Sequence, residues 1–399
     1  MKDISILKRL RSVTLDRQGL LQPSRFGQGK LAVQNAVEHL GYIQIDTLSI
    51  VERAHHHTLW TRIPDYQPEY LDALVTERKV FEYWFHAASY LPMKDFRYVL
   101  TQMLAVKHHP SHYYNADPKI MKYVMDKIRA EGPKKSRDFE SESKKAGSWW
   151  NWKPTKLALE RLFMQGDLMI CERHGMQKTY DVCERVLPQN VDTTAPSPIE
   201  FAEYIVKTYL RAYGFTTFKQ IIHLKTGAEL KKNVVDVLNA MLEQGVIEKI
   251  NVLGIPDIFV QSGLMDQTFN FSISSVRLLS PFDNVIIHRE RAKQIFDFDF
   301  RLECYTPKEK RHYGYFCLPI LFGDTFIGRV DCKAHRKEQR FELIQIHIEN
   351  MEIEVEKWIA SFIVLVRQFA TFNGCQVVTL TKVSPLKFEK IFQQSIQAC

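Results

Sequence analysis

The chain has 399 residues, of which 45% are hydrophobic and 25% charged, a globular composition with room for two or three domains. It contains no apolar run of the about 18 residues that a membrane span requires, and its N-terminus lacks the apolar segment of a signal peptide. The seven cysteines include no Cys-x-x-Cys pair, which favours reduced thiols and a cytoplasmic protein over a disulfide or zinc framework. A formal net charge of +8 suggests an anionic partner. Whether that partner is nucleic acid depends on where the basic residues lie.

The first predicted module occupies residues 1–95. A helix with apolar spacing of three and four, "LAVQNAVEHLG", ends at Gly41 and is followed by a strand, "YIQID". Thr47 is a candidate cap for a short helix that begins "TLSIVERAH". A longer helix, "QPEYLDALVTERK", and a β-hairpin, "VFEYWFHAASYLP", follow. Helix, short helix, helix and hairpin is the order of a winged helix-turn-helix, and this module adds a strand after its first helix.

The same order recurs twice more along the chain. Long amphipathic helices, "PKIMKYVMDKIRAEG" and "SPIEFAEYIVKTYLRAYG", belong to modules predicted at 96–192 and 193–265. In each module the last helix ends with Gln-Gly, where Gly166 and Gly245 suit a left-handed backbone, and a hairpin follows. An internal repeat of this size indicates the fold before any motif is considered. We therefore expect three tandem winged helix-turn-helix modules.

Residues 266–399 have a different pattern. Segments such as "RHYGYFCLPILFGDTFIGRVDCKAH" and "EQRFELIQIHIE" alternate apolar and polar residues, and Gly323-Asp324 is a hairpin signal. Pro319 inside the first of these predicts an edge strand or a bulge. A long apolar helix, "EIEVEKWIASFIVLVRQFATFNG", comes next, before a last strand. The fold class is then α+β, with the modules followed by a small antiparallel β-barrel or sheet domain with packed helices.

Gln44 and Asp46 are the residues in which we expect the chemistry. Side chains two residues apart share one face of a strand, so Gln44 and Asp46 would lie with Tyr42, opposite a buried face of isoleucines. In a winged helix the first strand pairs with the hairpin, which would add further possible pocket residues: Glu82, Tyr83, Trp84 and His86. Judged from spacing alone, a strand Asp is more often a cap for Thr47 or Ser49 than a catalyst.

Basic residues gather at two places. One is the segment "GPKKSRDFESESKKAGSWWNWKPTK" beside the expected recognition helix of the middle module, and the other is the predicted hairpin tip in "DCKAHRKEQR". A solvated linker and a tip charged for solubility are the simpler interpretations. Two basic protrusions on a chain with three winged helices nevertheless favour contacts with DNA phosphates. The candidate DNA-binding residues are Lys134, Lys135, Arg137, Lys153, Lys156, Arg329, Lys333, His335, Arg336 and Lys337.

The sequence carries no familiar metal or nucleotide motif. Three adjacent histidines at 55–57 cannot converge on one ion, and no HExxH or Cys/His spacing accompanies them. The patterns GxxxxGK[ST], GxGxxG and GxSxG are also missing. We therefore expect no metal and no cofactor.

Three stretches resemble a known family: "LGYIQIDTLSIVERAHHHTLWTR", "EYWFHAASYLP" and the segment 278–336, which begins "LLSPFDNVIIHRERAK". They look like the bacterial crosslink-repair DNA glycosylases of the YcaQ/AlkX and AlkZ type, over nearly the whole chain. The resemblance implies tandem winged helices in a concave arrangement with a β-barrel. It also implies a monofunctional enzyme that excises N7-alkylated purines and unhooks interstrand crosslinks. The catalytic signature of the family is Gln-x-Gln in one branch and Gln-x-Asp in the broader one, and Gln44-Ile45-Asp46 resembles the second.

The expected partner is double-stranded DNA that bears alkylated purines or crosslinks, bound by a monomer. A crosslinked base stays tied to the opposite strand, so it cannot enter a deep pocket as an ordinary flipped base does. We therefore expect a shallow, open site. Two alternatives remain at this point. One is a non-enzymatic winged-helix DNA-binding regulator, and the other is a bifunctional lyase with a Schiff-base lysine, for which the sequence places no lysine near "QID".

Overall fold

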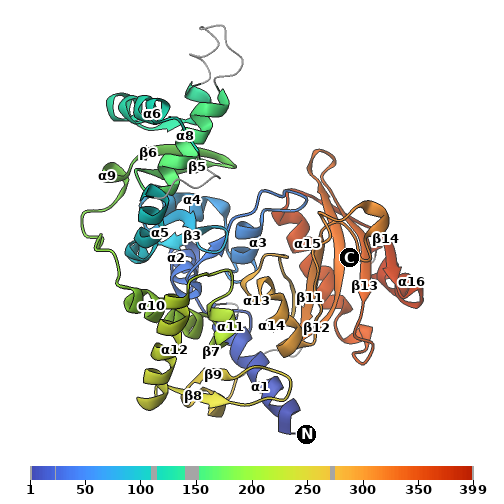
Figure 1. The fold of residues 1–399 in the computed structure, drawn as a ribbon. Helices are drawn as coiled ribbons and strands as arrows, with labels where there is room; N and C mark the ends of the chain where they lie inside the picture. Colours follow the sequence, from blue (N-terminus) through green and yellow to red (C-terminus); the bar gives the residue numbers. More distant parts are fainter. Residues whose placement is uncertain (1, 23, 109–114, 140–151, 270–274, 398–399) are drawn as a thin grey trace.

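The computed structural model describes residues 2–22, 24–108, 115–139, 152–269 and 275–397. Three helical modules, each with a small three-stranded sheet, form a column, and a region with a five-stranded sheet stands beside it (Figure 1). Module 1 lies in the middle of the column, between module 2 at the top and module 3 at the bottom of the view (Figure 1). The predicted α+β class is confirmed. Among the described residues, no helix has the length and apolarity to span a bilayer.

Module 1 follows an N-terminal helix, α1 (Lys2–Arg17), and has the predicted order of elements. Gly41 ends the first helix of the module because its φ of 82° is left-handed, which glycine adopts without strain. The three strands pair in the order β1-β3-β2, with Ile43 opposite Tyr90 and Gln44 opposite Ser89. The elements are α2 (Gly29–Leu40), β1 (Ile43–Gln44), α3 (Ala54–Trp60), α4 (Pro68–Thr76), β2 (Val80–Trp84) and β3 (Ala88–Pro92).

The prediction of a helix that begins at Thr47 is wrong. Residues 45–53 form an irregular loop, and α3 begins only at Ala54. The side chain of Asp46 turns the chain at the start of this loop by accepting a hydrogen bond from the Leu48 amide at 2.7 Å. Further along, the Ala334 amide donates to the Ile50 carbonyl at 2.9 Å, so backbone pairing with the C-terminal region replaces a helical turn.

Modules 2 and 3 have the predicted order helix, short helix, helix, hairpin, with a 3-10 turn as the short helix of module 2. The structure adds a strand after the first helix of each, which was predicted from the sequence only for module 1. Their sheets are also antiparallel, in the orders β4-β6-β5 and β7-β9-β8. Module 2, after the linking helix α5 (Arg97–His108), contains α6 (Pro118–Glu131), β4 (Lys134–Lys135), the 3-10 turn Ser136–Phe139, α8 (Trp152–Met164), β5 (Leu168–His174) and β6 (Gln177–Val182), and ends with α9 (Cys183–Val186). Module 3 contains α10 (Pro198–Tyr213), β7 (Phe215–Thr217), α11 (Phe218–Ile221), α12 (Ala228–Glu243), β8 (Ile247–Ile250) and β9 (Ile258–Gln261).

The C-terminal region is built on a sheet with the strand order β10-β11-β12-β13-β14. The prediction of a purely antiparallel sheet needs a correction, since β14 pairs parallel with β13. Helix α15 connects these two strands and returns the chain to the end from which β13 began, as a parallel pair requires. The elements are β10 (Val276–Leu278), α13 (Asn284–Ile287), α14 (Arg289–Phe296), β11 (Cys317–Phe322), β12 (Thr325–His335), β13 (Arg340–Ile348), α15 (Ile359–Phe372), β14 (Val377–Ser384) and α16 (Glu389–Gln397).

Helices cover both faces of this sheet. On one face α15 and α16 pack through side chains such as Phe362, Val366 and Phe392, which are fully buried. On the other face α14 and α1 contribute buried residues, including Phe296 and Leu10. Pro319 lies in β11, an interior strand, directly before a register shift at 320–321, so the expected irregularity is present but not at a sheet edge.

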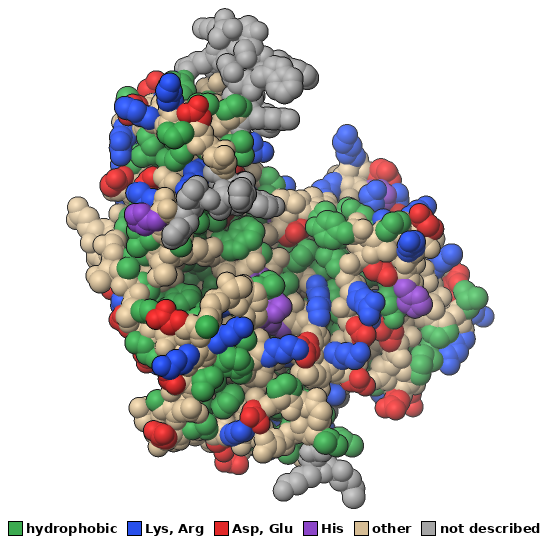
Figure 2. Space-filling model, in the orientation of Figure 1, with side chains coloured by type: hydrophobic (Ala, Val, Ile, Leu, Met, Phe, Trp, Pro, Cys, Tyr) green, Lys and Arg blue, Asp and Glu red, His purple; other side chains and the backbone are tan. Residues whose placement is uncertain are grey.

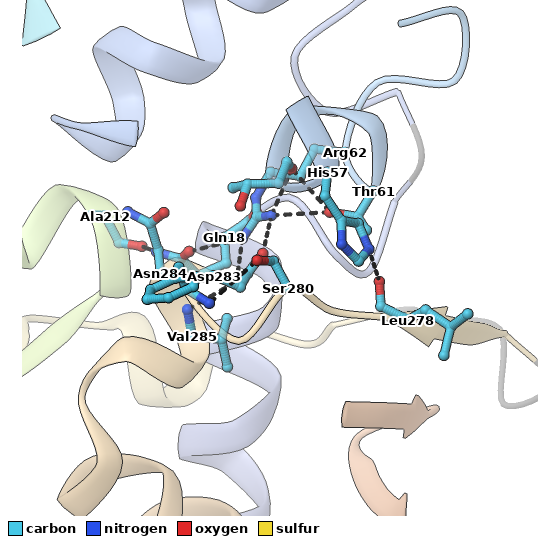
Figure 3. Close-up of polar contacts among 12 residues, drawn as sticks. Gln18, His57, Thr61, Arg62, Ala212, Leu278, Ser280, Asp283, Asn284 and Val285 are labelled. Carbon is cyan, nitrogen blue, oxygen red and sulfur yellow. Dashed lines mark hydrogen bonds and ion pairs between the residues drawn. The ribbon is translucent and has the colours of Figure 1, made fainter. Parts of the chain in front are cut away.

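A buried ion pair fastens module 1 to the C-terminal region (Figure 3). Arg62, just after α3, donates from Nη1 and Nη2 to the two carboxylate oxygens of Asp283 at 2.6 and 2.9 Å, and both side chains are 0% exposed. His57 of α3 adds a hydrogen bond of 2.9 Å to the Leu278 carbonyl. Gln18 completes the cluster, because its backbone and side-chain oxygens accept from Arg62. Module 1 is therefore held rigidly against the sheet region.

Candidate active site

Gln44 ends β1 and is held by the hairpin of its own module. Its side chain is 9% exposed, and Oε1 lies 2.9 Å from Nε2 of His86, in the turn between β2 and β3. Burial lowers the pKa of His86 to about 4, with smaller contributions from the positive charge of Lys225 and from His223. At neutral pH the imidazole is uncharged, and we assign the Nε2 proton to this bond because the amide oxygen can only accept.

Asp46 lies just beyond the strand, on the loop that leads to the C-terminal region. Its Oδ1 accepts the Leu48 amide, and the side chain is half-buried. Burial raises the pKa of Asp46, and the bond from Leu48 opposes part of the rise. Burial and then the charge of Asp46 raise the pKa of Cys304, so the segment at 304–305 faces the carboxylate. Tyr305 in that segment is 81% exposed, which leaves an aromatic ring in solvent near Asp46.

Tyr42, two residues before Gln44, packs against the hairpin that holds the Gln44 side chain. It is 2% exposed and stacks on Phe85, with ring centroids 4.7 Å apart, while its ring meets that of His86 edge-on at 4.8 Å. The Tyr42 carbonyl accepts a hydrogen bond of 3.2 Å from the amide of Asn284, which belongs to α13. Ile43 and Ile45 are buried in a different cluster, so the predicted alternation of faces is present.

Two of the predicted pocket residues have structural partners instead. Glu82 is 4% exposed and accepts from both Nε and Nη2 of Arg173 in β5, at 2.9 and 2.6 Å. Tyr83 is 1% exposed and donates to the Met164 carbonyl at 2.6 Å. Tyr83 shares a face of the sheet with Gln44, since both lie in register with Ser89, whereas Glu82 lies on the other face. Through these bonds both side chains connect module 1 to module 2. Trp84 is 41% exposed at the end of β2.

A loop of module 3 reaches the same place. Lys225, between α11 and α12, lies over the ring of Phe85, with Nζ 4.4 Å from the centroid. Burial lowers the pKa of Lys225 to about 8. Its neighbour His223 packs edge-on against His288 at 4.9 Å. Phe85 and Lys225 are 140 positions apart in the numbering, and no sequence pattern in either segment signals the contact.

The triple histidine belongs to the core of module 1. His55, His56 and His57 are 2%, 9% and 0% exposed. His56 Nδ1 lies 2.7 Å from the Tyr66 hydroxyl, and burial lowers the pKa of His56 to about 3. Within the residues that the structure describes, no group of three His, Cys, Asp or Glu side chains is placed to hold a metal ion.

The predicted basic residues of the β12–β13 hairpin separate into two groups. Lys333 and Lys337 are exposed at the tip. Arg336 instead donates to the Ser49 carbonyl at 3.1 Å and so braces the loop that carries Asp46. His335 lies 2.8 Å from Glu342. Arg329 is 1% exposed and pairs with a glutamate at 2.6 Å, which removes it from the predicted DNA-binding set.

The basic segment of module 2 is only partly described. Lys134 forms an ion pair of 2.9 Å with Glu131, and Lys135 is half-buried in β4. Arg137 and Lys156 are exposed, whereas the side chain of Lys153 lies outside the described residues. On the face shown in Figure 2, Lys and Arg side chains form a band across the middle, with histidines beside it.

Comparison with known proteins gives two matches. Residues 37–362 match a family model described as DNA glycosylase AlkZ-like. The solved structure of the Streptomyces sahachiroi DNA glycosylase AlkZ is similar, with a TM-score of 0.62 and 14% sequence identity, over 94% of this chain and 99% of that one. At this identity the likeness of the structures concerns the fold.

Proposed function

This chain belongs to the AlkZ-like DNA glycosylase family, and we propose that it hydrolyses the N-glycosidic bond of N7-alkylated purines in double-stranded DNA, including purines tied in interstrand crosslinks. Family membership sets aside the regulator without enzymatic activity. The single observation that supports the proposal best is the pair formed by Gln44, fixed by His86, and Asp46, fixed by the Leu48 amide. Gln44, at the end of β1, and Asp46, two residues later, form the Gln-x-Asp sequence.

Asp46 is the proposed catalytic carboxylate. As the base departs with the bonding electrons, positive charge develops on the deoxyribose, and a fixed carboxylate beside C1′ stabilises it. Asp46 then accepts a proton from the water that adds to C1′, and general-base assistance of this kind contributes about 10²–10⁴-fold. Half-burial removes competing water and raises the pKa of Asp46, which makes the carboxylate a better proton acceptor.

Gln44 is the proposed positioning group for the water. Its amide oxygen has two lone pairs, and the bond from His86 occupies one of them. The second lone pair and the amide N–H₂ remain for the water and the sugar. An N7-alkylated purine already carries positive charge, so it leaves as a neutral base without protonation. A carboxylate and an amide are therefore sufficient for this substrate class, and the proposal uses no metal or cofactor.

The DNA path is proposed from the arrangement of the modules. We infer that the three modules are winged helices and that duplex DNA lies against them and the β12–β13 hairpin, with Lys333 and Lys337 on phosphates. Exposure of Tyr305 near Asp46 is consistent with the open site expected for a crosslinked base.

The proposal is tested by product analysis on defined substrates. Purified protein is incubated with duplexes that contain 7-methylguanine, a mustard interstrand crosslink or no damage, and the products are assayed for free base and abasic sites. We expect base release from both damaged duplexes and none from the control, without strand cleavage. Release of other bases with intact 7-methylguanine would overturn the substrate class. Strand cleavage together with borohydride trapping would show a lyase.

A further inference from the structure

Lys225 is a partly buried lysine on a loop of module 3 that lies beside the hairpin of module 1. Its ammonium group lies 4.4 Å from the centre of the Phe85 ring. Phe85 in turn stacks on Tyr42, and the next residue, His86, bonds Gln44. Lys225 therefore stands one side chain away from the proposed catalytic strand.

No carboxylate compensates the charge of Lys225 in the described part of the chain. The titratable groups that face it are imidazoles: His86 from the hairpin of module 1, His223 from its own loop and His288 from the start of α14. Glu290 acts on His223, but it is paired with Lys219 at 2.7 Å. Contact with an aromatic face offsets part of the desolvation of a cation.

The backbone holds this lysine in place at some cost. Leu224, directly before it, has a φ of 56°, which a branched side chain rarely adopts, and its own side chain is 70% exposed. Strained backbone of this kind persists where the surrounding structure requires it and is common in binding sites. His223 also lines a cavity of about 270 Å³, in which Lys219, Arg289 and Arg291 outnumber the one carboxylate, Glu290.

We propose that Lys225 binds the DNA phosphate next to the nucleotide that lies at Gln44 and Asp46, whether or not that nucleotide is damaged, and thereby couples module 3 to the catalytic strand of module 1. The proposal rests on the proposed function, because Gln44 and Asp46 have to mark the position of the damaged sugar. A phosphate adjoins each side of every deoxyribose. Its negative charge would pair with the Lys225 ammonium group, which has no carboxylate partner among the described residues. An ammonium group serves here as a point charge for phosphate.

The proposal predicts a pH-dependent affinity. Burial holds the pKa of Lys225 at about 8 in the free protein, and a bound phosphate raises it. Binding is then unaffected below pH 8 and weakens above it, because the lysine has to take up a proton in order to bind. The facing imidazoles do not titrate in this range, since burial lowers the pKa values of His86, His223 and His288 from an ordinary value of 6.5.

The experiment measures the dissociation constant of an undamaged duplex between pH 6.5 and 9.5, and its salt dependence at pH 7, for wild type, Lys225→Arg and Lys225→Gln. Lys231→Gln, an exposed lysine of α12, is the matched control. For Lys225→Gln we expect about ten- to hundredfold weaker binding and a slope of log K against log salt that is smaller by about 0.9. Lys225→Arg should keep the slope and lose the weakening above pH 8.

Three outcomes overturn the proposal: an unchanged slope in Lys225→Gln, a wild-type affinity without pH dependence above 8, or Lys225→Arg behaving as Lys225→Gln. The pH profile of wild type is measured without any substitution, so it still tests the proposal if a Lys225 variant fails to fold. Failure of the proposed function is distinguishable, because it would appear as missing base release by wild type while the binding curves remain readable.

Discussion

Module 1 and module 3 contain the same strand in the same place, and they use it differently. Both strands follow a helix that ends at a left-handed glycine, Gly41 or Gly214. Three residues after the glycine, module 1 has Gln44 and module 3 has Thr217. Thr217 caps the next helix at once, in a capping box with Gln220. Gln44 caps nothing, and nine residues of loop separate it from α3.

The site therefore depends on the segment that comes after the strand. In module 3 the Thr217 hydroxyl accepts the Gln220 amide and the residue is 3% exposed, so its side chain serves the next helix and is not open to a substrate. In module 1 the chain continues along the C-terminal region, where the Ala334 amide and Arg336 hold the loop. Gln44 and Asp46 keep unused hydrogen-bonding capacity on a rigid support, as a catalytic pair requires.

We expect the greatest loss of activity from Asp46→Asn. An asparagine oxygen can still accept the Leu48 amide, so the turn is kept while the negative charge is lost. Release of 7-methylguanine should fall by about 10²–10⁴-fold, with affinity for the damaged duplex close to that of wild type. Single-turnover base release and a binding titration measure the two quantities separately.

Module 2 supplies a matched control for this variant. Asp138 follows β4 and accepts the Lys135 amide at 2.7 Å, so it is also a turn-forming carboxylate after the first strand of a module. Asp138→Asn should leave the rate unchanged. Equal activity of Asp46→Asn and wild type would mean that Asp46 only forms the turn. The first strand of module 1 would then differ from that of module 3 in structure but not in function.

The second prediction concerns the buried ion pair between Arg62 and Asp283, which holds module 1 against the C-terminal region. Asp283→Asn leaves the fully buried guanidinium of Arg62 without its counter-ion, and breaking such a pair costs about 3–5 kcal/mol of unfolding free energy. Chemical denaturation at neutral pH measures the loss. The exposed pair between Lys30 and Glu77 is the control, and Glu77→Gln should cost about 0–1 kcal/mol. Equal effects of the two variants would contradict a clamp at Arg62.

A third variant gives module 1 the residue of module 3. Gln44→Thr puts a shorter polar side chain on β1, and its hydroxyl cannot reach both His86 and a water molecule. Loss of one such hydrogen bond at a charged transition state reduces the rate by about ten- to hundredfold. The same single-turnover assay measures it, and Gln44→Glu serves as a comparison that keeps the length and reach of the side chain. A wild-type rate for Gln44→Thr would assign Gln44 to packing.

Sequence patterns predicted the local part of this structure and not its long-range contacts. Apolar spacing and helix-ending glycines depend on neighbouring residues, so the order of elements in the modules could be predicted, and period-two alternation put Ile43 and Ile45 on the buried face. The burial of Glu82, of Arg329 and of the lysine above Phe85 depends on partners far away in sequence. A glutamate on a hairpin has the same local pattern whether it faces substrate or pairs with Arg173.

A weaker effect separates the two kinds of basic residue at the β12–β13 tip. Lys333 and Lys337 are exposed, and neither forms an ion pair with another described residue, so their charges are available to DNA. Replacing both with Gln should lower the slope of log K against log salt by about 0.9 for each phosphate that the hairpin no longer neutralises. Single-turnover base release at saturating enzyme should not change.

Arg336→Gln should give the opposite result in the same two assays. Its guanidinium bonds the Ser49 carbonyl within the loop 45–53, so its loss displaces Asp46 and lowers the single-turnover rate while the salt slope stays near that of wild type. Identical behaviour of Arg336→Gln and the double lysine variant would mean that the hairpin tip acts only as a charged surface. The loop after β1 would then owe its shape to its other contacts, which include the Asp46 turn, the Ile50 carbonyl and the bond from the Glu52 amide to Asn373.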